Sequence, residues 1–465
     1  MCDKNDKEII QADNIVGSYE MIEEIMDKIS SIDIHTHLFP PEFHDMFSCG
    51  IDELLTYHYL AAEYFSHPVP HTPEEFYSLS KQSQAEYVWE KLFVQNTPIS
   101  EACKGVLTVL DILRLHMELK ELNLNKIREW FDKQQNQNMY VDLIFVLSKV
   151  NYVYMTNNPF DPIETKYWRG GVQYNRNKFR SCIRMDELFY PDKLYALRDH
   201  IDSNFLPKQK TIVLDDFVDD SDDSDGSDNS NNDTTSIWDY WDRENNIEYF
   251  YEYLSTYLND WYKILGPDYV MMSLPYDFSL NNIYQNKVMA NIVIPFAQKY
   301  SLPIFLKIGA NRQVNPELKL AGDGVGVSEL DWLGYLCKTY PGIKFVATVL
   351  SINNQHQLAV LSRKFSNLHI YGCWWFCNVP TITHTVTNMR LELLGTSFTY
   401  QHSDSRVLEH LLYKWTHSRQ QLLDILCAKY NELAITPYVL TKNHIINDIR
   451  GLLGGRYLEY IHKKT

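Results

Sequence analysis

The spacing of apolar and polar residues changes near residue 31, and this change marks the first predicted strand. Residues 14–30 carry apolar side chains at helical spacing, which predicts an opening helix. Residues 31–40 then start with an alternating, β-branched pattern that predicts a short buried strand, and the Pro-Pro pair at 40–41 predicts a loop. Because side chains two apart on a strand share one face, we expect His35 and His37 to point the same way where this strand ends.

The chain from residue 51 to residue 150 is mostly helical by pattern. Four segments have apolar residues at i, i+3 and i+4, namely 52–65, 83–94, 100–119 and 124–134. A helical block of this size after a first strand is a larger excursion than a plain crossover between neighbouring strands. We therefore predict a helical insertion over residues 45–150.

Strand-like and helical segments then alternate along the rest of the chain. The predicted strands are 152–155, 179–183, 269–273, 302–308, 343–350 and 368–371, with helices between several of them, for example 245–263, 284–300 and 354–365. Such alternation favours a parallel α/β sheet, and many repeats favour closure into a barrel. The predicted architecture is a distorted (β/α)8 TIM barrel over residues 31–465, preceded by an N-terminal helical leader at residues 1–30.

One acidic tract interrupts this alternation. Residues 215–236 are rich in Asp, Ser and Asn and contain no Lys or Arg. The tract cannot bury enough apolar surface to order itself, so we predict a disordered loop. It lacks the twelve-residue spacing and closing Glu of a calcium-binding loop. Because the helical pattern of 245–263 continues the alternation, we interpret the tract as an insertion within the barrel.

Composition and charge indicate which partners and which cellular compartment to expect. The net charge of −17 argues against a nucleic-acid partner, which requires a basic face. The sequence has no run of 18 apolar residues and no apolar segment near its N-terminus, so we expect neither a membrane span nor a signal peptide. The eight Cys are scattered without C-x-x-C pairs, which indicates reduced thiols and a cytoplasmic protein. Assembly into a homo-oligomer stays open.

The His-x-His pair is the sharpest chemical signal in the sequence. Two imidazoles on one strand face can bind a divalent metal, and strand ends at a barrel mouth carry catalytic residues. An ordinary polar pair at a strand end is the alternative for His35 and His37. Near the other end of the chain, Asp404 can add a carboxylate that binds metal or accepts a proton, with Arg406 two residues on. The alternative for Asp404 is a helix N-cap with a salt bridge.

Seven short motifs, in one order along residues 31–425, resemble the uronate isomerase (glucuronate isomerase) family of the amidohydrolase superfamily. They are Asp33-Ile34-His35-Thr36-His37-Leu38, His58-Tyr59, residues 154–161, Arg184-Met185-Asp186, residues 306–312, Trp374-Trp375-Phe376 and Asp404-Ser405-Arg406. Without this resemblance, the aromatic segments at 57–59 and 374–376 are more typical of a buried core.

The resemblance implies an aldose–ketose isomerisation of a sugar acid, of the D-glucuronate to D-fructuronate or D-galacturonate to D-tagaturonate type. It implies one divalent metal ion, for which zinc is preferred, although manganese or iron also fits. The residues to which it gives roles are His35, His37 and Asp404 as metal ligands, His58, Arg184, Arg406 and Trp375 as substrate-binding residues, and Asp404 and Tyr59 in proton transfer.

The sequence departs from the family pattern at several positions. Lys307 stands where the family has a His on a central strand, and it either neutralises an anionic intermediate or fills a structural slot. Asn157 and Asn158 replace two acidic residues, and the role of Arg312 stays open. Two other functions are therefore kept: a metal-dependent hydrolase or decarboxylase of the same superfamily, in which Asp404 activates a metal-bound water, and a binding protein that has lost catalysis.

Overall fold

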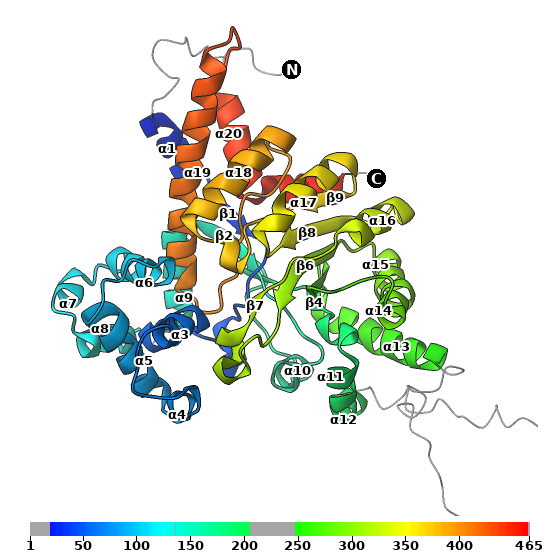
Figure 1. The fold of residues 1–465 in the computed structure, drawn as a ribbon, viewed down its shortest axis with the longest axis horizontal. Coiled ribbons are helices and arrows are strands. Elements are labelled where there is room, and N and C mark those ends of the chain that lie inside the picture. Colours follow the sequence, from blue (N-terminus) through cyan, green and yellow to red (C-terminus); the bar gives the residue numbers. More distant parts are fainter. Residues whose placement is uncertain (1–18, 135, 205–246, 464–465) are drawn as a thin grey trace, which may run out of the picture.

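The computed structural model describes residues 19–134, 136–204 and 247–463. Strands lie at the centre and helices surround them, while the helices that follow the first strand form a lobe on one side (Figure 1). The predicted acidic loop at 215–236 and residues 1–18 of the predicted leader lie outside the described residues.

The strands form two parallel sheets. The first has the order β1-β2-β3, and the second has the order β4-β5-β6-β8-β9 with β7 antiparallel to the end of β6. Their bounds are β1 Ser31–Asp33, β2 Val150–Tyr154, β3 Phe179–Arg180, β4 Ile183–Arg184, β5 Val270–Pro275, β6 Ile304–Asn311, β7 Gly324–Val325, β8 Phe345–Val349 and β9 Leu368–Ile370.

Backbone contacts join the two sheets into a closed ring. At one junction, Arg184 N donates to Asn157 O at 2.8 Å. At the other, Tyr371 pairs in parallel with Thr399, and Asp404 N donates to His35 O at 3.2 Å. The last barrel segment is therefore the irregular stretch 399–405. The predicted α/β fold, a distorted (β/α)8 barrel, is confirmed.

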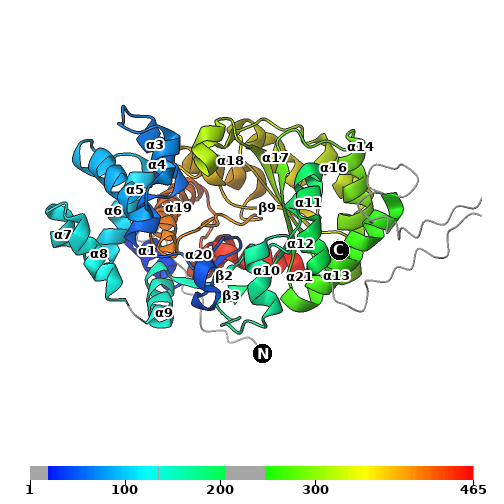
Figure 2. The same cartoon turned by 90° about the horizontal axis from the view of Figure 1, so that it is seen from below.

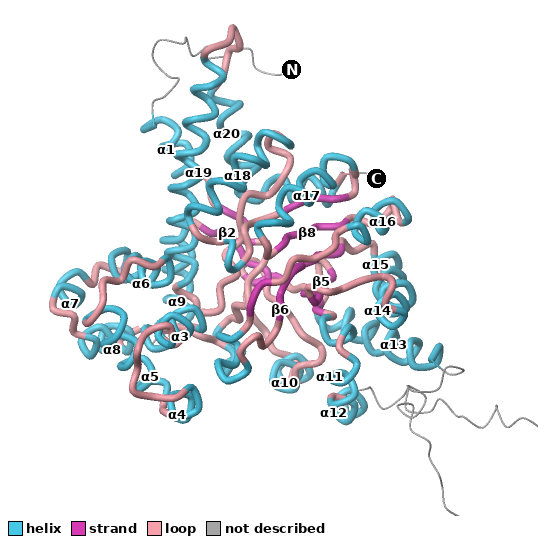
Figure 3. The backbone as a smooth tube through the Cα atoms, viewed as in Figure 1, coloured by secondary structure: helices cyan, strands magenta, loops and turns pink. Residues whose placement is uncertain are grey.

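The helices form the lobe and the outer layer of the barrel (Figures 2 and 3). Between β1 and β2 lie α2 Ile51–Leu55, α3 His58–Phe65, α4 Pro73–Ser78, α5 Lys81–Trp89, α6 Glu101–Ile112, α7 His116–Lys120, α8 Leu124–Asp132 and α9 Gln137–Ser148. The remaining helices are α1 Tyr19–Asp27, α10 Pro162–Arg169, α11 Pro191–Ala196, α12 Arg198–Ser203, α13 Ile247–Leu265, α14 Ile283–Val288, α15 Ile294–Tyr300, α16 Asp331–Thr339, α17 Ile352–Lys364, α18 Pro380–Leu394, α19 His410–Ala434, α20 Lys442–Arg450 and α21 Arg456–His462. The division of the chain into a leader and a barrel domain stays a prediction. None of the described helices is long and apolar enough to cross a membrane.

Three local predictions are wrong in their boundaries. The first strand ends at Asp33, so His35 and His37 lie in the segment after it and not on the strand itself. The helix predicted over 100–119 is broken after α6, where Arg114 adopts a positive φ of 64°. The helix predicted over 52–65 is also interrupted, and α3 begins at His58.

Aromatic and apolar side chains close the interior of the barrel beneath the candidate site. They come from the strands, from residues next to the strand ends and from α21, and Tyr269 stacks on Phe305 with ring centroids 3.8 Å apart. The full set is Ile34, Tyr154, Cys182, Tyr269, Met271, Phe305, Val346, Tyr371 and Tyr457. This packed layer fills the barrel interior, so the polar groups collect at the carboxyl ends of the strands.

Candidate active site

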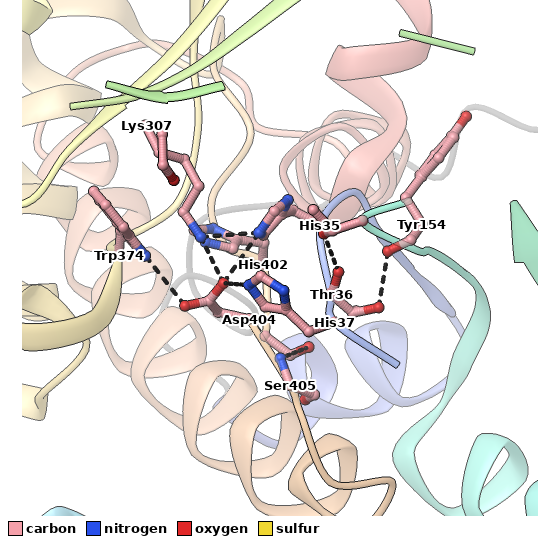
Figure 4. A network of polar contacts seen from close by, with 12 residues as sticks. His35, Thr36, His37, Tyr154, Lys307, Trp374, His402, Asp404 and Ser405 are labelled. Carbon is pink, nitrogen blue, oxygen red and sulfur yellow. Dashed lines mark hydrogen bonds and ion pairs between the residues drawn. The ribbon is translucent and has the colours of Figure 1, made fainter. Parts of the chain in front are cut away.

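Four polar side chains meet at the mouth of the barrel, and we call them the polar centre: His35, His37, Lys307 and Asp404 (Figure 4). Oδ1 of Asp404 lies 3.1 Å from Nε2 of His35, 3.4 Å from Nε2 of His37 and 2.6 Å from Nζ of Lys307. Nζ of Lys307 also lies 2.8 Å from Nε2 of His35. Trp374 Nε1 donates to the other oxygen of Asp404 at 3.1 Å. One carboxylate oxygen thus contacts three nitrogen-bearing side chains.

The barrel brings these residues together from three distant segments. His35 and His37 follow β1, Lys307 lies within β6, and Asp404 ends the 399–405 stretch. Asp404 has a positive φ of 53°, and its amide bonds to the carbonyl of His35. The carboxyl ends of parallel barrel strands share one face of the barrel, and these contacts therefore follow from closure of the ring.

Electrostatics fix the charge of each member of the polar centre. Burial alone would raise the pKa of Asp404, but the nearby ammonium of Lys307 holds it well below its usual value. Burial and the nearby Lys307 lower the pKa of His35 to about 4, and burial and Arg406 lower that of His37. Burial lowers the pKa of Lys307 to about 8, with Asp404 opposing the change. At neutral pH the polar centre therefore contains a carboxylate, an ammonium and two neutral imidazoles.

Asp33 fixes the segment that carries Asp404. Its buried carboxylate accepts hydrogen bonds from the amide of Ser403 at 3.1 Å and from Trp415 Nε1 at 2.9 Å. Burial raises the pKa of Asp33 to about 6, against the effect of these donors. Asp33 thus ties β1 to the residue before Asp404 and to α19.

The donor types of the polar centre suit a divalent metal. His35, His37 and Asp404 each offer one ligand atom, and these atoms lie within 4.8 Å of one another. Two neutral imidazoles and a carboxylate are ordinary zinc ligands. The predicted ligands are therefore together, but the ammonium of Lys307 hydrogen-bonds to two of the same three atoms.

The N-cap alternative for Asp404 is wrong, since α19 begins at His410 with Glu409 as its N-cap.

A cavity of about 230 Å³ has His58 and Tyr59 in its wall, and the charge of Asp404 in the polar centre acts on the pKa of both side chains. His58, Tyr59 and Trp375 line it, and the rings of Tyr59 and Trp375 lie nearly parallel, with centroids 6.3 Å apart. Burial raises the pKa of Tyr59 well above its usual value, so its hydroxyl stays protonated. Burial, followed by the charge of Arg406, lowers the pKa of His58. The cavity therefore combines the neutral side chains of His58 and Tyr59 with aromatic faces, and Glu101 and Lys414 add charged groups to its wall.

Comparison with solved structures identifies the family. An uronate isomerase from Bacillus halodurans C-125 is 35% identical, with 96% of each chain covered and a TM-score of 0.82. The chain belongs to the uronate isomerase family. An uronate isomerase from Thermotoga maritima, 14% identical over 95% of this chain and 97% of that one, has a TM-score of 0.68. A glucuronate isomerase from Caulobacter crescentus, 12% identical over 100% and 99%, has a TM-score of 0.63.

The last two similarities support the fold alone. No protein-family model matches the sequence, and a search of curated proteins finds no match either. The family resemblance stated from the motifs is therefore confirmed by the first solved structure, whose identity extends over nearly the whole chain.

Two arginines in the motifs that resemble the uronate isomerase family form ion pairs with aspartates of the same chain. Arg184 pairs with Asp186 at 2.5 Å, and Asp186 also accepts from the amide of Ser273 at 2.8 Å. Arg312 pairs with Asp323 at 2.6 Å and lies 5.9 Å from the ring centroid of Trp375. Each arginine is therefore held in place before any ligand binds.

The two Asn that replace the family's acidic residues form a structural network. Asn157 Nδ2 and the amide of Asn158 donate to the two oxygens of Glu164, at 2.8 Å and 2.7 Å. Asn158 Nδ2 also donates to Glu187 at 2.9 Å. These side chains hold the loop after β2 against α10.

Lys414 and His402 were missed by the sequence predictions. Lys414 lines the cavity, is 7% exposed and lies over the rings of Tyr59 and Tyr413. Among the described residues no side chain forms a hydrogen bond or ion pair with it. The ring centroid of His402 is 5.6 Å from that of His35, and neither ring nitrogen has a described partner. His402 could have been predicted as a site residue from its position two residues before Asp404. Lys414 lies in a segment with helical spacing, and nothing in that pattern distinguished it from an ordinary helix residue.

Proposed function

We propose that this protein interconverts an aldohexuronate and a ketohexuronate, of the D-glucuronate to D-fructuronate type. The observation that carries the proposal is the carboxylate of Asp404, which stays ionised in a buried centre and whose charge reaches His58 and Tyr59 in the wall of a cavity of about 230 Å³. Lys414 is a buried cation in the wall of this cavity and suits an anionic substrate, while Lys307 is a buried cation within the polar centre. A base beside a cationic group is the arrangement that proton abstraction next to a carbonyl requires.

The residues present can complete the proton balance of this isomerisation. Asp404 takes the proton from C2 of the aldose, and the electron pair of that bond forms the C1–C2 double bond of an enediol. Tyr59, which is protonated, assists the transfer of the hydroxyl proton from O2 to O1. Asp404 then returns its proton to C1, so the reaction consumes no other reactant.

Substrate orientation falls to the groups around the cavity. His58 and Trp375 line it, and Arg406 lies close enough to lower the pKa of His58. We assign His58, Arg184 and Arg406 to the carboxylate and hydroxyls of the sugar acid, and Trp375 to its apolar face. The prior pairing of Arg184 with Asp186 favours a hydroxyl over a carboxylate as its contact.

We also propose that the site can bind one divalent ion, because its side chains are of the types that bind such ions. His35, His37 and Asp404 would hold one ion, and zinc suits two imidazoles and a carboxylate better than it suits all-oxygen sites. When bound, it would supply positive charge for an oxyanion. No feature of the described site favours the hydrolase alternative over isomerisation.

A panel of hexuronates tests the proposal directly. The full-length chain, with and without added zinc, is incubated with D-glucuronate and D-galacturonate, and ketose formation is followed by ¹H NMR. The expected result is conversion to the ketose without release of a fragment, lost in Asp404→Asn. Release of a fragment would contradict isomerisation, and so would the absence of ketose from both substrates.

We also propose a compartment and the partners of the protein. The described cysteines form no disulfide, in keeping with a reducing cytoplasm. We propose a small-molecule sugar acid as the partner, with neither nucleic acid nor membrane, and leave assembly into a homo-oligomer to measurement of the mass in solution.

A further inference from the structure

We propose that Lys307 occupies the cation position of the polar centre and competes with a divalent ion for its ligands. The protein would then bind divalent metal weakly and supply positive charge to the site from its own side chain. The catalytic part of this inference rests on the proposed function, whereas the part about metal affinity does not.

The contacts of Lys307 are the first argument. Its Nζ lies 2.6 Å from Oδ1 of Asp404 and 2.8 Å from Nε2 of His35, and both atoms belong to the candidate metal-binding group. The side chain of Lys307 is 2% exposed, and its ammonium lies 4.5 Å from the centroid of the Trp374 ring. The ammonium is therefore enclosed by the same groups that would enclose a metal.

The direction of the hydrogen bonds is the second argument. An ammonium has three donors and no acceptor, so Nε2 of His35 and Oδ1 of Asp404 must both accept from Lys307. These two acceptors lie 3.1 Å apart, an arrangement that a cation between them stabilises. Lys307 thus makes the contacts that a bound metal would make with the same lone pairs.

Steric and electrostatic exclusion follow from these positions. A zinc ion lies about 2.0–2.2 Å from imidazole nitrogen and carboxylate oxygen, so it would have to stand close to the observed ammonium. Two cations at that separation repel strongly in a buried site. Metal therefore enters only when the ammonium leaves its position, and this cost lowers the measured affinity.

Lys414 shows that burial of a lysine in this region does not by itself produce such contacts. It is also buried, but it lies over aromatic rings and contacts none of the candidate metal ligands. The two lysines therefore form a matched pair, since one blocks the ligands directly and the other only adds charge nearby.

The first experiment measures zinc affinity and needs no substrate. Full-length wild type, Lys307→Met, Lys307→His and Lys414→Met are stripped with a chelator and titrated with zinc by calorimetry. We expect Lys307→Met to bind at least about tenfold more tightly than wild type, because even at an effective dielectric constant of about 20 the repulsion removed exceeds that free energy. Lys307→His, which adds a ligand in place of the charge, should bind more tightly still.

Several outcomes would overturn the inference. Equal affinities for wild type and both Lys307 variants would mean that the ammonium does not compete. An equal gain in Lys414→Met would mean that general charge, and not occupation of the ligand atoms, sets the affinity. Circular dichroism identifies a variant that fails to fold, and the two Lys307 replacements give independent measurements if one of them does.

A second experiment separates this inference from the proposed function. Ketose formation by wild type is measured before and after exhaustive chelation. Unchanged kcat after chelation supports Lys307 as the working cation. Loss of activity that zinc restores would overturn the inference and leave the isomerase proposal standing. If neither form isomerises any hexuronate, the proposed function fails, and the zinc titrations alone still decide whether Lys307 competes for the ligands.

Discussion

The ammonium of Lys307 lies 2.6 Å from Oδ1 of Asp404, although 97 positions of the chain separate the two residues. This contact keeps the carboxylate ionised inside a buried centre, as a proton acceptor must be. The ammonium also hydrogen-bonds to Oδ1 of Asp404, and the family resemblance assigns Asp404 as a metal ligand. The same pair therefore determines both the base and the cation of the proposed reaction.

Asp404→Asn should abolish turnover without unfolding the protein. The amide has the size of the carboxylate but cannot accept the C2 proton, so we expect kcat to fall by about 10²–10⁴-fold. Ketose formation measures the loss, and thermal unfolding checks that the fold is retained. The matched control is Asp424→Asn, an exposed position on α19, which should keep wild-type kcat. Full activity in Asp404→Asn would remove this residue from the mechanism.

Lys414→Met should weaken substrate binding more than it slows the reaction. Lys414 is a buried ammonium with aromatic neighbours, on the cavity wall, so an anionic substrate is its natural counter-ion. Loss of a hydrogen bond to a charged group predicts an increase in KM of about 10- to 100-fold. Lys429→Met is the control, because Lys429 lies on the same helix but pairs with Glu392. An unchanged KM in Lys414→Met would show that the sugar acid binds elsewhere in the cavity.

Asp33→Asn should disturb the site without touching substrate. The new amide group would face either the amide of Ser403 or the indole N–H of Trp415, and a buried donor without an acceptor costs about 1–3 kcal/mol. Displacement of the Asp404 segment should lower kcat by up to about 10²-fold. Urea unfolding and kcat are measured together.

The double variant Asp33→Asn/Trp415→Phe removes one of the two competing donors. Its loss of stability should be smaller than the sum of the two single losses, because the residues share one hydrogen bond. Simple additivity would mean that the contact between Asp33 and Trp415 does not hold the segment.

Glu409 should make stability fall as the pH rises. Its buried carboxyl accepts from the amide of Gly50 and from Tyr140, yet burial raises its pKa from 4.5 to about 7. Between these values the unfolded chain loses a proton that the folded chain keeps, so stability decreases with pH until the folded carboxyl ionises. The loss is on the order of 3 kcal/mol.

Glu409→Gln isolates this effect, because glutamine can accept the same hydrogen bonds and does not titrate. Wild type and the variant should have similar melting temperatures near pH 5, and the variant should be more stable at pH 8. Parallel pH profiles for the two proteins would contradict the assignment to Glu409.

Local sequence pattern predicted the central strands well. The strands β5, β6 and β8 are buried on both faces, which produces near-continuous apolar runs that are typical of parallel sheets. The pattern failed where backbone geometry changes without a change of periodicity. Arg114 interrupts a run whose apolar spacing continues beyond it, and β1 ends before the histidines although the sequence stays strand-like.

The amino-acid sequence by itself determined the fold class, through the alternation of strand and helix patterns, and the family, through seven motifs in order. It also determined the types of group at the site, because His35-x-His37 and Asp404-x-Arg406 can be recognised as short motifs. Only the tertiary structure decided that Lys307 lies between His35 and Asp404, that Arg184 and Arg312 are already paired, and that Lys414 faces the cavity. The physical reason is that periodicity reports which face of an element is buried. Which side chains meet across the barrel mouth depends on how the closed ring aligns segments that are far apart in the chain.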